Sequence, residues 1–368
     1  KNEIGNNEII TAVSGGVDSL TAALLVNTIA KNKMTCVLID TGFMRKNEVK
    51  EISLEMKKIG LKVDIIDASK EFISDLENVN DAEDKRKIFR ERFYNVLSEK
   101  ARRLNAKFLV QGTIAPDWIE TVGKIKTQHN ILKQIGIDPE SKYGIKVIEP
   151  LSELYKDEVR EIAKFLGISK KLFLRQPFPG PGLLVRIIGR ITVEKLCIER
   201  EIDYIVTSVF RERNYSQYFA AVFEKNMSDN DKVKLSLQKI LGNDAKFWIA
   251  ESRVTGVKGD TRNYGLSVFL EKPTLEKLDF DQAKKIALLV TQLDEVSRFL
   301  VKINCTEVNE LNVAVVRAVI TEDFMTASIP SVDLNDLYQI SKKIEMVEGV
   351  NESYFDFTSK PPGTIEFE

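Results

Sequence analysis

The first half of the chain alternates short apolar runs with longer amphipathic stretches. The apolar runs predict buried strands at 8–13, 34–40, 63–67, 108–111 and 147–148. Between them, apolar residues recur at helical spacing and predict helices at 17–30, 45–60, 84–104 and 156–166. This alternation predicts an α/β fold, a doubly wound parallel sheet with helices on both faces. Ligands of such sheets bind at the carboxyl ends of the strands.

The pattern changes after residues 175–182, where proline and glycine are too dense for regular structure. This segment is either a plain linker or a rigid loop shaped around Phe178. Beyond it, helices are predicted at 187–206 and 334–346, and strands at 266–270, 313–320 and 354–357. We therefore expect a first domain over residues 1–185 and a smaller α+β domain over residues 186–368.

Composition excludes several classes of function. The 54 Lys and Arg residues nearly balance the 55 Asp and Glu residues, so the chain lacks an overall basic footprint for nucleic acid or an anionic membrane. The 3 cysteines lie far apart and form no metal or redox motif, which is typical of reduced thiols in a cytoplasmic protein. With His129 as the single histidine, catalysis would rely on backbone donors, Lys, Arg, carboxylates and a bound metal ion.

The segment from Ser14 to Ser19, Ser-Gly-Gly-Val-Asp-Ser, falls between the first predicted strand and the first predicted helix. Gly15 and Gly16 allow the backbone to approach an anion closely. The following helix offers unpaired N–H groups and the positive end of its dipole, and the two serines add hydroxyl donors. The segment is therefore a candidate phosphate-binding loop of a type other than the Walker motif. The alternative is an N-capped helix after a tight turn.

This segment resembles the pyrophosphate-binding loop of the N-type ATP pyrophosphatases, a superfamily that includes GMP synthetase, NAD synthetase and tRNA-thiolating enzymes. Further segments, in the same order along the chain, are similar to motifs of the GMP synthetases. They lie at 40–48, 85–88, 111–120, 125–130, 149–160, 175–182, 256–265 and 359–368.

The resemblance implies an ATP pyrophosphatase that makes GMP from XMP, ATP and ammonia, a step of guanine nucleotide synthesis. XMP would be adenylylated with release of pyrophosphate, and ammonia would then displace AMP. Mg²⁺ is the implied cofactor and ATP the co-substrate. The implied partners are a glutaminase, as a separate subunit or as part of a longer chain, and a second copy bound through the C-terminal domain. Neither nucleic acid nor a membrane is expected as a partner.

The resemblance also assigns residues to the ATP site. Those for ATP and pyrophosphate are Ser14, Gly15, Gly16, Val17, Asp18, Ser19, Leu20, Asp40, Gly42, Gln111 and Gly112. Oxygen ligands suit Mg²⁺, which makes Asp18, Asp117 and Glu120 the candidate metal ligands. Asp18, Lys126 and Lys156 are the candidate catalytic residues, since a lysine neutralises charge that grows on phosphate during transfer. The alternatives are a surface or capping role for each carboxylate and full solvation for each lysine.

The implied XMP site is divided along the sequence. Its residues are Arg86, Asp260, Lys360, Thr364, Ile365 and Glu366. For Arg86 the alternative is an exposed helix face, and for the last residues of the chain it is a solvated tail.

Some features depart from the resemblance. Gln128 and Gln176 stand where the family has histidine. Residues 224–246 and 271–310 read as insertions, which we expect on the surface of the second domain. Two rival functions remain open: another reaction of the same superfamily, and a regulatory protein that binds nucleotide without turnover.

Overall fold

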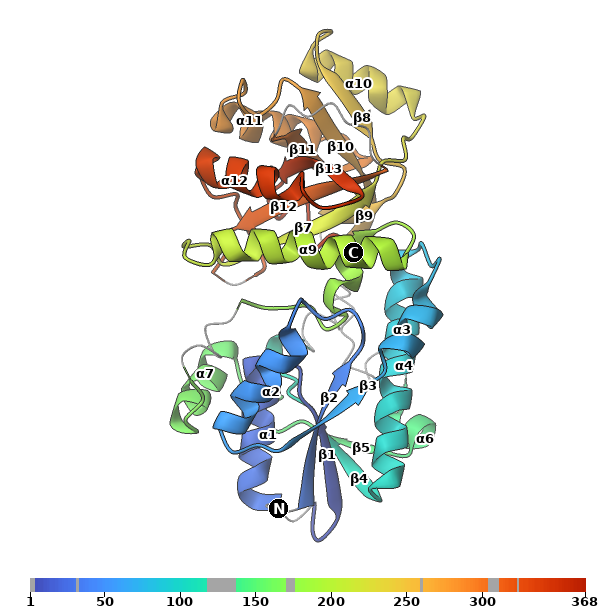
Figure 1. Ribbon diagram of the computed structural model, residues 1–368, viewed down its shortest axis with the longest axis vertical. Helices are drawn as coiled ribbons and strands as arrows, with labels where there is room; N and C mark the ends of the chain where they lie inside the picture. The colour runs from blue at the N-terminus through green and yellow to red at the C-terminus, as the bar shows by residue number, and fades with distance from the viewer. Residues whose placement is uncertain are drawn as a thin grey trace. The chain divides into compact units, whose positions relative to one another are not determined.

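The computed structural model of the chain describes residues 4–30, 33–117, 137–169, 176–258, 261–303, 311–322 and 324–368. Contacts divide the chain into two units (Figure 1). Unit 1 comprises Lys1–Leu76 and Lys85–Gly182. Unit 2 comprises Glu77–Asp84 and Leu183–Glu368, so a short segment from the first half of the sequence belongs to it.

Unit 1 is built on a five-stranded sheet with the order β3-β2-β1-β4-β5. The strands are β1 (Glu8–Ala12), β2 (Met34–Asp40), β3 (Val63–Asp67), β4 (Ala106–Val110) and β5 (Lys146–Ile148). All of the neighbouring pairs are parallel. The chain runs outward from β1 to β3 and then returns to the other side of β1, so a topological switch point lies between β1 and β4.

The helices of unit 1 cover both faces of this sheet. They are α1 (Val17–Ala30), α2 (Glu48–Lys58), α3 (Ser69–Leu76), α4 (Ala82–Arg103), α6 (Pro139–Tyr143) and α7 (Lys156–Phe165). Helices α1, α2 and α7 lie on one face, and α3, α4 and α6 lie on the other (Figure 1). This arrangement confirms the doubly wound α/β fold that the sequence predicts.

Helix α1 is apolar on more than one side because it has two sets of neighbours. Leu20 and Ala23 join a core cluster with Leu38 of β2. Ala22 packs in a second cluster that includes Val159 of α7. A helix covered on several sides reads as apolar all round, and its burial fixes the position of its first turn.

Unit 2 contains a mixed eight-stranded sheet with the order β6-β7-β12-β13-β11-β10-β8, and β9 pairs with β10. Its strands are β6 (Ile187–Ile188), β7 (Gln217–Glu224), β8 (Lys246–Ile249), β9 (Val254–Lys258), β10 (Thr261–Lys272), β11 (Val296–Lys302), β12 (Asn312–Val319) and β13 (Val350–Asp356). Its helices are the 3₁₀ helix Gly182–Arg186, α9 (Val193–Phe210), α10 (Asp231–Leu241), α11 (Phe280–Val290) and α12 (Leu334–Ile344).

The helix predicted at 187–206 is wrong at its start. Ile187 and Ile188 form β6 instead, and Gly189 then takes a φ of 81°, which interrupts any helix. Helix α9 begins only after Thr192, whose hydroxyl accepts a hydrogen bond of 3.1 Å from the backbone N–H of Lys195. Such an N-cap satisfies a donor that the first turn leaves unpaired.

The expected surface position of residues 271–310 is also wrong in part. This segment contains β11, whose side chains are all buried. The strand lies between β10 and β13 in the sheet and hydrogen-bonds to both. In the other expected insertion, 224–246, α10 buries Val233 and Leu237 and leaves Leu235 exposed.

Two observations bear on the class of protein. In the described part of the chain, no helix is long and apolar enough to cross a membrane. Cys36 and Cys197 are unpaired thiols, and burial raises the pKa of the Cys36 thiol to about 11. Cys305 and His129 lie outside the described residues.

An acidic side chain is buried under α9. Glu199 is fully buried, close to Asp203 and to the equally buried Arg186. Burial, and then the negative charge of Asp203, raise the pKa of Glu199 well above its ordinary value, although Arg186 opposes them. The folded protein therefore holds this proton to a higher pH than the unfolded chain does.

We predict that Glu199→Gln stabilises the protein increasingly as pH rises. The raised pKa means that the native state loses stability between the unfolded and folded pKa values of this carboxyl, by up to about 1.4 kcal/mol per pH unit. The amide carries no such penalty. Thermal unfolding at pH 5 and pH 8 should show a gain in Tm over wild type that is larger at pH 8. The exposed Glu212→Gln serves as control, and equal gains at both pH values would contradict the assignment.

Candidate functional site

The loop between β1 and α1 is closed by its own hydroxyl groups. Ser14 and Ser19 share a hydrogen bond of 3.2 Å between their Oγ atoms. Ser19 also donates to the carbonyl of Gly16 at 3.0 Å and accepts from the backbone N–H of Ser14 at 3.3 Å. Gly15 has a φ of 78°, which favours glycine. The loop therefore has a defined shape at the amino end of α1.

The residues of this loop divide into two kinds. Val17 and Leu20 are buried in the core and anchor the first turn of α1. Ser14 and Gly16 are exposed, and Asp18 and Ser19 are half-buried. Any contact of Val17 or Leu20 with a ligand would therefore be through the backbone, whereas the hydroxyls and the Asp18 carboxylate are accessible as side chains.

Asp18 forms an ion pair with Lys156, the first residue of α7. The Lys156 Nζ atom lies 2.5 Å from Asp18 Oδ2, and the two side chains are 35% and 25% exposed. The other carboxylate oxygen, Asp18 Oδ1, is buried and makes no hydrogen bond within the described residues. An unsatisfied buried oxygen is costly unless a ligand or water completes it.

The next strand ends contribute further predicted residues. Asp40 ends β2 and accepts a hydrogen bond of 2.9 Å from the backbone N–H of Gly42, which has a φ of 77°. Gln111 follows β4 and donates to the hydroxyl of Tyr94 on α4 at 2.6 Å. The remaining amide oxygen, Gln111 Oε1, is buried without a hydrogen bond to the described residues.

Gly112 lies directly against the first turn of α1. A β-carbon at this position would lie 2.6 Å from both the carbonyl carbon of Asp18 and the backbone nitrogen of Ser19. Only glycine permits this approach of two backbones. The loops after β1 and β4 therefore meet at the switch point of the sheet.

Two other predicted site residues of unit 1, Asp117 and Arg86, lie within the described part of the chain. The Asp117 carboxylate accepts a hydrogen bond of 3.0 Å from the backbone N–H of Ile114 and so closes its own turn. Arg86 is half-buried on α4, rather than on a fully exposed face. Lys126, Glu120 and Asp260 lie outside the described residues, as does Gln128.

The proline- and glycine-rich segment, described from residue 176, packs against the segment after β2. The guanidinium carbon of Arg45 lies 4.3 Å from the ring centroid of Phe178. A β-carbon on Gly182 would lie 2.3 Å from the carbonyl oxygen of Phe43, and Gly182 has a φ of 67°. These contacts favour the rigid loop over the plain linker.

In unit 2 the end of the chain packs against β9. The backbone N–H of Val257 donates to the carbonyl of Pro362 at 2.7 Å, and that of Thr255 donates to the carbonyl of Phe367 at 2.8 Å. The hydroxyls of Thr255 and Thr364 share a hydrogen bond of 2.8 Å. The two segments of this unit that the sequence links to XMP, 256–265 and 359–368, thus lie side by side.

Buried arginines hold the end of the chain in place. Arg186 makes two hydrogen bonds to the Glu366 carboxylate, at 3.0 and 2.9 Å, which form a bidentate pair. Arg317 donates to the carbonyls of Thr364 and Ile365 at 3.0 and 2.9 Å. The last residues are therefore an ordered part of the unit, and the alternative of a solvated tail is wrong.

Two of these arginines share one carboxylate. Arg298 and Arg317 are fully buried, and each donates to Asp356, at 3.1 and 2.6 Å. Burial, and then the charge of Arg317, lower the pKa of Arg298 to about 9, and burial lowers the pKa of Arg317 too. Asp356 and Glu366 oppose this lowering, because their negative charges favour the protonated form of both arginines.

The predicted XMP residues of the tail differ in accessibility. Lys360 is half-buried and donates to the carbonyl of Phe324 at 2.5 Å. Glu366 is committed to Arg186 and to Gln217, whose amide donates to it at 2.9 Å. Ile365 is 8% exposed.

Sequence reasoning misses several residues that shape these regions. Tyr94 and the arginines at 186, 298 and 317 belong to no recognisable motif. The available sign is chemical: Arg298 and Arg317 stand among apolar residues in strands that are buried throughout. A charged residue in such a run needs a buried partner.

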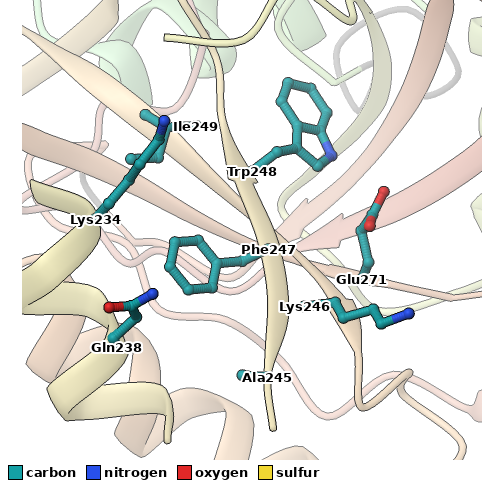
Figure 2. Close-up of a pocket in the computed structure, with 8 residues that line it drawn as sticks. All are labelled: Lys234, Gln238, Ala245, Lys246, Phe247, Trp248, Ile249 and Glu271. Carbon is teal, nitrogen blue, oxygen red and sulfur yellow. The ribbon is translucent and has the colours of Figure 1, made fainter. Parts of the chain in front are cut away.

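A separate pocket of about 390 Å³ lies in unit 2, between α10 and β8 (Figure 2). It is lined by Lys234, Gln238, Ala245, Lys246, Phe247, Trp248, Ile249 and Glu271. None of these belongs to the residues predicted to bind ATP or XMP.

Two known families match different parts of this chain. Residues 1–169 match the PP-loop domain, and residues 306–367 match the GMP synthase C terminal domain. A solved structure of NMN synthetase from Francisella tularensis aligns with 49% of this chain and 70% of its own, with 18% identity and a TM-score of 0.38.

Curated relatives match along the whole chain. The B subunit of GMP synthase [glutamine-hydrolyzing] from Saccharolobus islandicus is 46% identical over 100% of this chain and 96% of its own length. The corresponding proteins of Sulfurisphaera tokodaii and Methanocaldococcus jannaschii are 44% and 37% identical, each over 100% of this chain and 95% of their own. Similarity of this degree and extent shows that the chain belongs to the family of GMP synthase B subunits.

Proposed function

We propose that this chain aminates XMP to GMP, using ATP to activate the nucleotide and ammonia as the nitrogen donor. The observation that carries the proposal is the loop from Ser14 to Ser19 at the switch point of a parallel sheet, with the Asp18–Lys156 pair beside it. Membership of the GMP synthase family supports the same reaction.

The reaction has two steps. The C2 oxygen of XMP attacks the α-phosphorus of ATP, and the bond from that phosphorus to the bridging oxygen breaks to release pyrophosphate. Ammonia then adds at C2, and AMP leaves with the original oxygen. The backbone N–H groups of the loop and the hydroxyls of Ser14 and Ser19 would hold the departing pyrophosphate. The protein would thus act by positioning and charge stabilisation.

The residues present suit a divalent cation. Asp18 Oδ1 is a buried oxygen without a hydrogen bond to the described residues, which suits a hard cation such as Mg²⁺. No cluster of three or more His, Cys, Asp or Glu occurs in the ranges that the structure describes. Bound Mg²⁺ would offset negative charge on the phosphates, with Asp18, Asp117 and Glu120 as its proposed ligands.

Lys156 and Lys126 are proposed to neutralise charge on the phosphates during transfer. Lys156 already contacts the loop through its ion pair with Asp18. Asp40, Gly42, Gln111 and Gly112 would form the neighbouring walls of the ATP site. The buried Gln111 Oε1 accepts no hydrogen bond from the described residues, and a donor on the nucleotide would satisfy it.

For XMP we propose Arg86, Asp260, Lys360, Thr364, Ile365 and Glu366. Lys360 is the best placed of the tail residues to bind an anionic group, because it carries a positive charge and is only half-buried. The pairing of Glu366 with Arg186 and the burial of Ile365 favour positioning roles, in which these residues hold the tail that presents Lys360.

The remaining expectations also belong to this proposal. A glutaminase would supply ammonia, in line with the names of the relatives, which describe one subunit of a glutamine-hydrolyzing enzyme. A second copy would bind through unit 2, the unit that contains the GMP synthase C terminal domain match. ATP and XMP are cytoplasmic metabolites, which supports a cytoplasmic location.

The reaction itself gives the first test. Purified chain with ATP, Mg²⁺ and ammonium should release pyrophosphate only when XMP is added, and GMP should form in equal amount. Asp18→Asn should lower this rate by about 100-fold or more, because a proposed ligand of the Mg²⁺ that offsets charge on the phosphates is lost. Pyrophosphate released with nicotinate adenine dinucleotide in place of XMP would support NAD synthesis instead. ATP binding without any XMP-dependent release would support a regulatory protein.

The close approach at Gly112 gives a second test. Gly112→Ala should push the first turn of α1 away from its position and weaken ATP binding by about tenfold, or 1.4 kcal/mol. Calorimetric titration with ATP measures this affinity. Gly60→Ala is the control, since Gly60 has a φ of 78° and open space around it. This control should lose about 1 kcal/mol of stability and keep its ATP affinity. Unchanged ATP affinity in Gly112→Ala would remove the role assigned to this contact.

Lys360 gives a third test. Lys360→Ala should raise the KM for XMP by about tenfold or more and change kcat little, as expected when a charge-assisted contact binds ground state and transition state alike. Steady-state kinetics at saturating ATP measure both constants. The exposed Lys342→Ala, which removes a surface ion pair with Glu345, is the matched control. An unaltered KM for XMP would reject Lys360 as a nucleotide contact.

A further inference from the structure

The position of Lys156 is unusual for a lysine. It is the first residue of α7, where the helix dipole presents positive charge and favours acidic side chains. Asp157 and Glu158 follow it in the same turn and fit that rule. A cation placed there needs an opposing anion, and Asp18 in the first turn of α1 provides it at 2.5 Å. Asp18 and Lys156 are therefore each other's charged partner in this structure.

We propose that Lys156 acts as an exchangeable counter-ion that keeps Asp18 from binding a divalent cation until a triphosphate arrives. The inference rests on the proposed function, because it takes Asp18 as a metal ligand. In the nucleotide-free protein the ammonium of Lys156 neutralises Asp18. A triphosphate on the loop offers Lys156 a more highly charged anion, and the whole carboxylate then becomes available. Nucleotide and divalent cation therefore bind together.

The unequal state of the two carboxylate oxygens supports this exchange. Asp18 Oδ2 is bound to Lys156, whereas Oδ1 is buried and without a hydrogen bond in the part of the chain that the structure describes. A carboxylate with a purely structural role would have both oxygens satisfied. Oδ1 therefore retains an unused capacity to accept a ligand, and the partial exposure of Lys156, 35%, allows its side chain to move.

The neighbouring backbone favours movement of Lys156 over movement of Asp18. The first turn of α1 is backed by Gly112 and anchored by Val17 and Leu20 in the core. Asp18 is thus held by the fold, and the flexible partner is the long lysine side chain. Its release requires only rotation about the bonds of that side chain.

The charge balance indicates how large the effect is. An exposed ion pair is weak because solvent screens it, and a partly buried pair such as this one is screened less. Removing the ammonium should therefore increase the affinity of Asp18 for a divalent cation about fivefold to tenfold in the absence of nucleotide. With nucleotide bound, the wild-type lysine has already left Asp18, so its removal should not increase that affinity further.

The experiment measures binding of Mn²⁺, by electron paramagnetic resonance, to the full chain without nucleotide and with α,β-methylene-ATP. The variants are Lys156→Met, Lys156→Gln, Asp18→Asn and the double variant Lys156→Met with Asp18→Asn. Two replacements of Lys156 are used so that a packing fault in one does not decide the result. Lys164→Met, which removes a positive charge from the exposed part of the same helix, is the matched control. Circular dichroism checks that every variant is folded.

The proposal predicts weak Mn²⁺ binding by wild type and by Lys164→Met without nucleotide. Both Lys156 variants should bind about fivefold to tenfold more tightly, and Asp18→Asn should cancel that gain in the double variant. Equal Mn²⁺ affinity in wild type and both Lys156 variants would overturn the counter-ion role. Tight, Asp18-dependent binding of Mn²⁺ by the wild-type protein in the absence of nucleotide would also overturn it. A separate result, unchanged Mn²⁺ affinity of Asp18→Asn with α,β-methylene-ATP, would instead reject the metal role of Asp18 in the proposed function.

Discussion

The contact between the backbone of Gly112 and the first turn of α1 is the constraint on which the proposed ATP site depends. It brings the end of β4 against Asp18 and Ser19 with no side chain between them. The parallel order of the sheet makes this contact available, because β1 and β4 are neighbours although about a hundred residues separate them in the sequence. Core packing of α1 on both of its buried sides then prevents the turn from moving away.

A different kind of interaction organises unit 2. Three large cations, Arg186, Arg298 and Arg317, are fully buried. Burial of a charge is expensive unless hydrogen bonds and an opposite charge compensate it. Asp356 and Glu366 supply the opposite charges, and the carbonyls of the last residues supply the remaining acceptors. The end of the chain therefore supplies hydrogen-bond acceptors that these buried arginines need. This requirement explains why the last residues have a defined conformation.

The extent to which the sequence predicts the fold differs between the units. In unit 1, strand and helix patterns alternate clearly and glycines mark the turns, so local patterns are enough to predict the sheet and the loop from Ser14 to Ser19. The ion pair of Asp18 with Lys156 cannot be predicted in this way, since 138 positions separate the two residues. Pairings of this length depend on the packing of α1 against α7, which no local pattern encodes.

In unit 2 the prediction of individual elements is less successful. The resemblance to the family marks residues 271–310 as an insertion, yet strand β11 within it is buried throughout, including the polar Ser297, Arg298 and Lys302. Arg298, for example, donates hydrogen bonds to the distant Asp356 and to the tail. The start of α9 is misplaced because Ile187 and Ile188 fit a helix as well as a strand. Tertiary hydrogen bonding decides both cases.

The segment Glu77–Asp84 has a consequence for dissecting the protein. It precedes most of unit 1 in the sequence, yet it belongs to unit 2. Asn78 and Val79 exchange backbone hydrogen bonds with Ile191, at 2.9 and 3.1 Å, and Glu83 pairs with Arg262 at 3.0 Å. A cut at residues 175–182 would leave this peptide on the N-terminal fragment, although it belongs to unit 2. The C-terminal fragment would then lack Glu83, the ion-pair partner of Arg262 at the start of β10. The two halves of the sequence are thus not two independent modules, and separate expression of either one would have to carry or replace that short peptide.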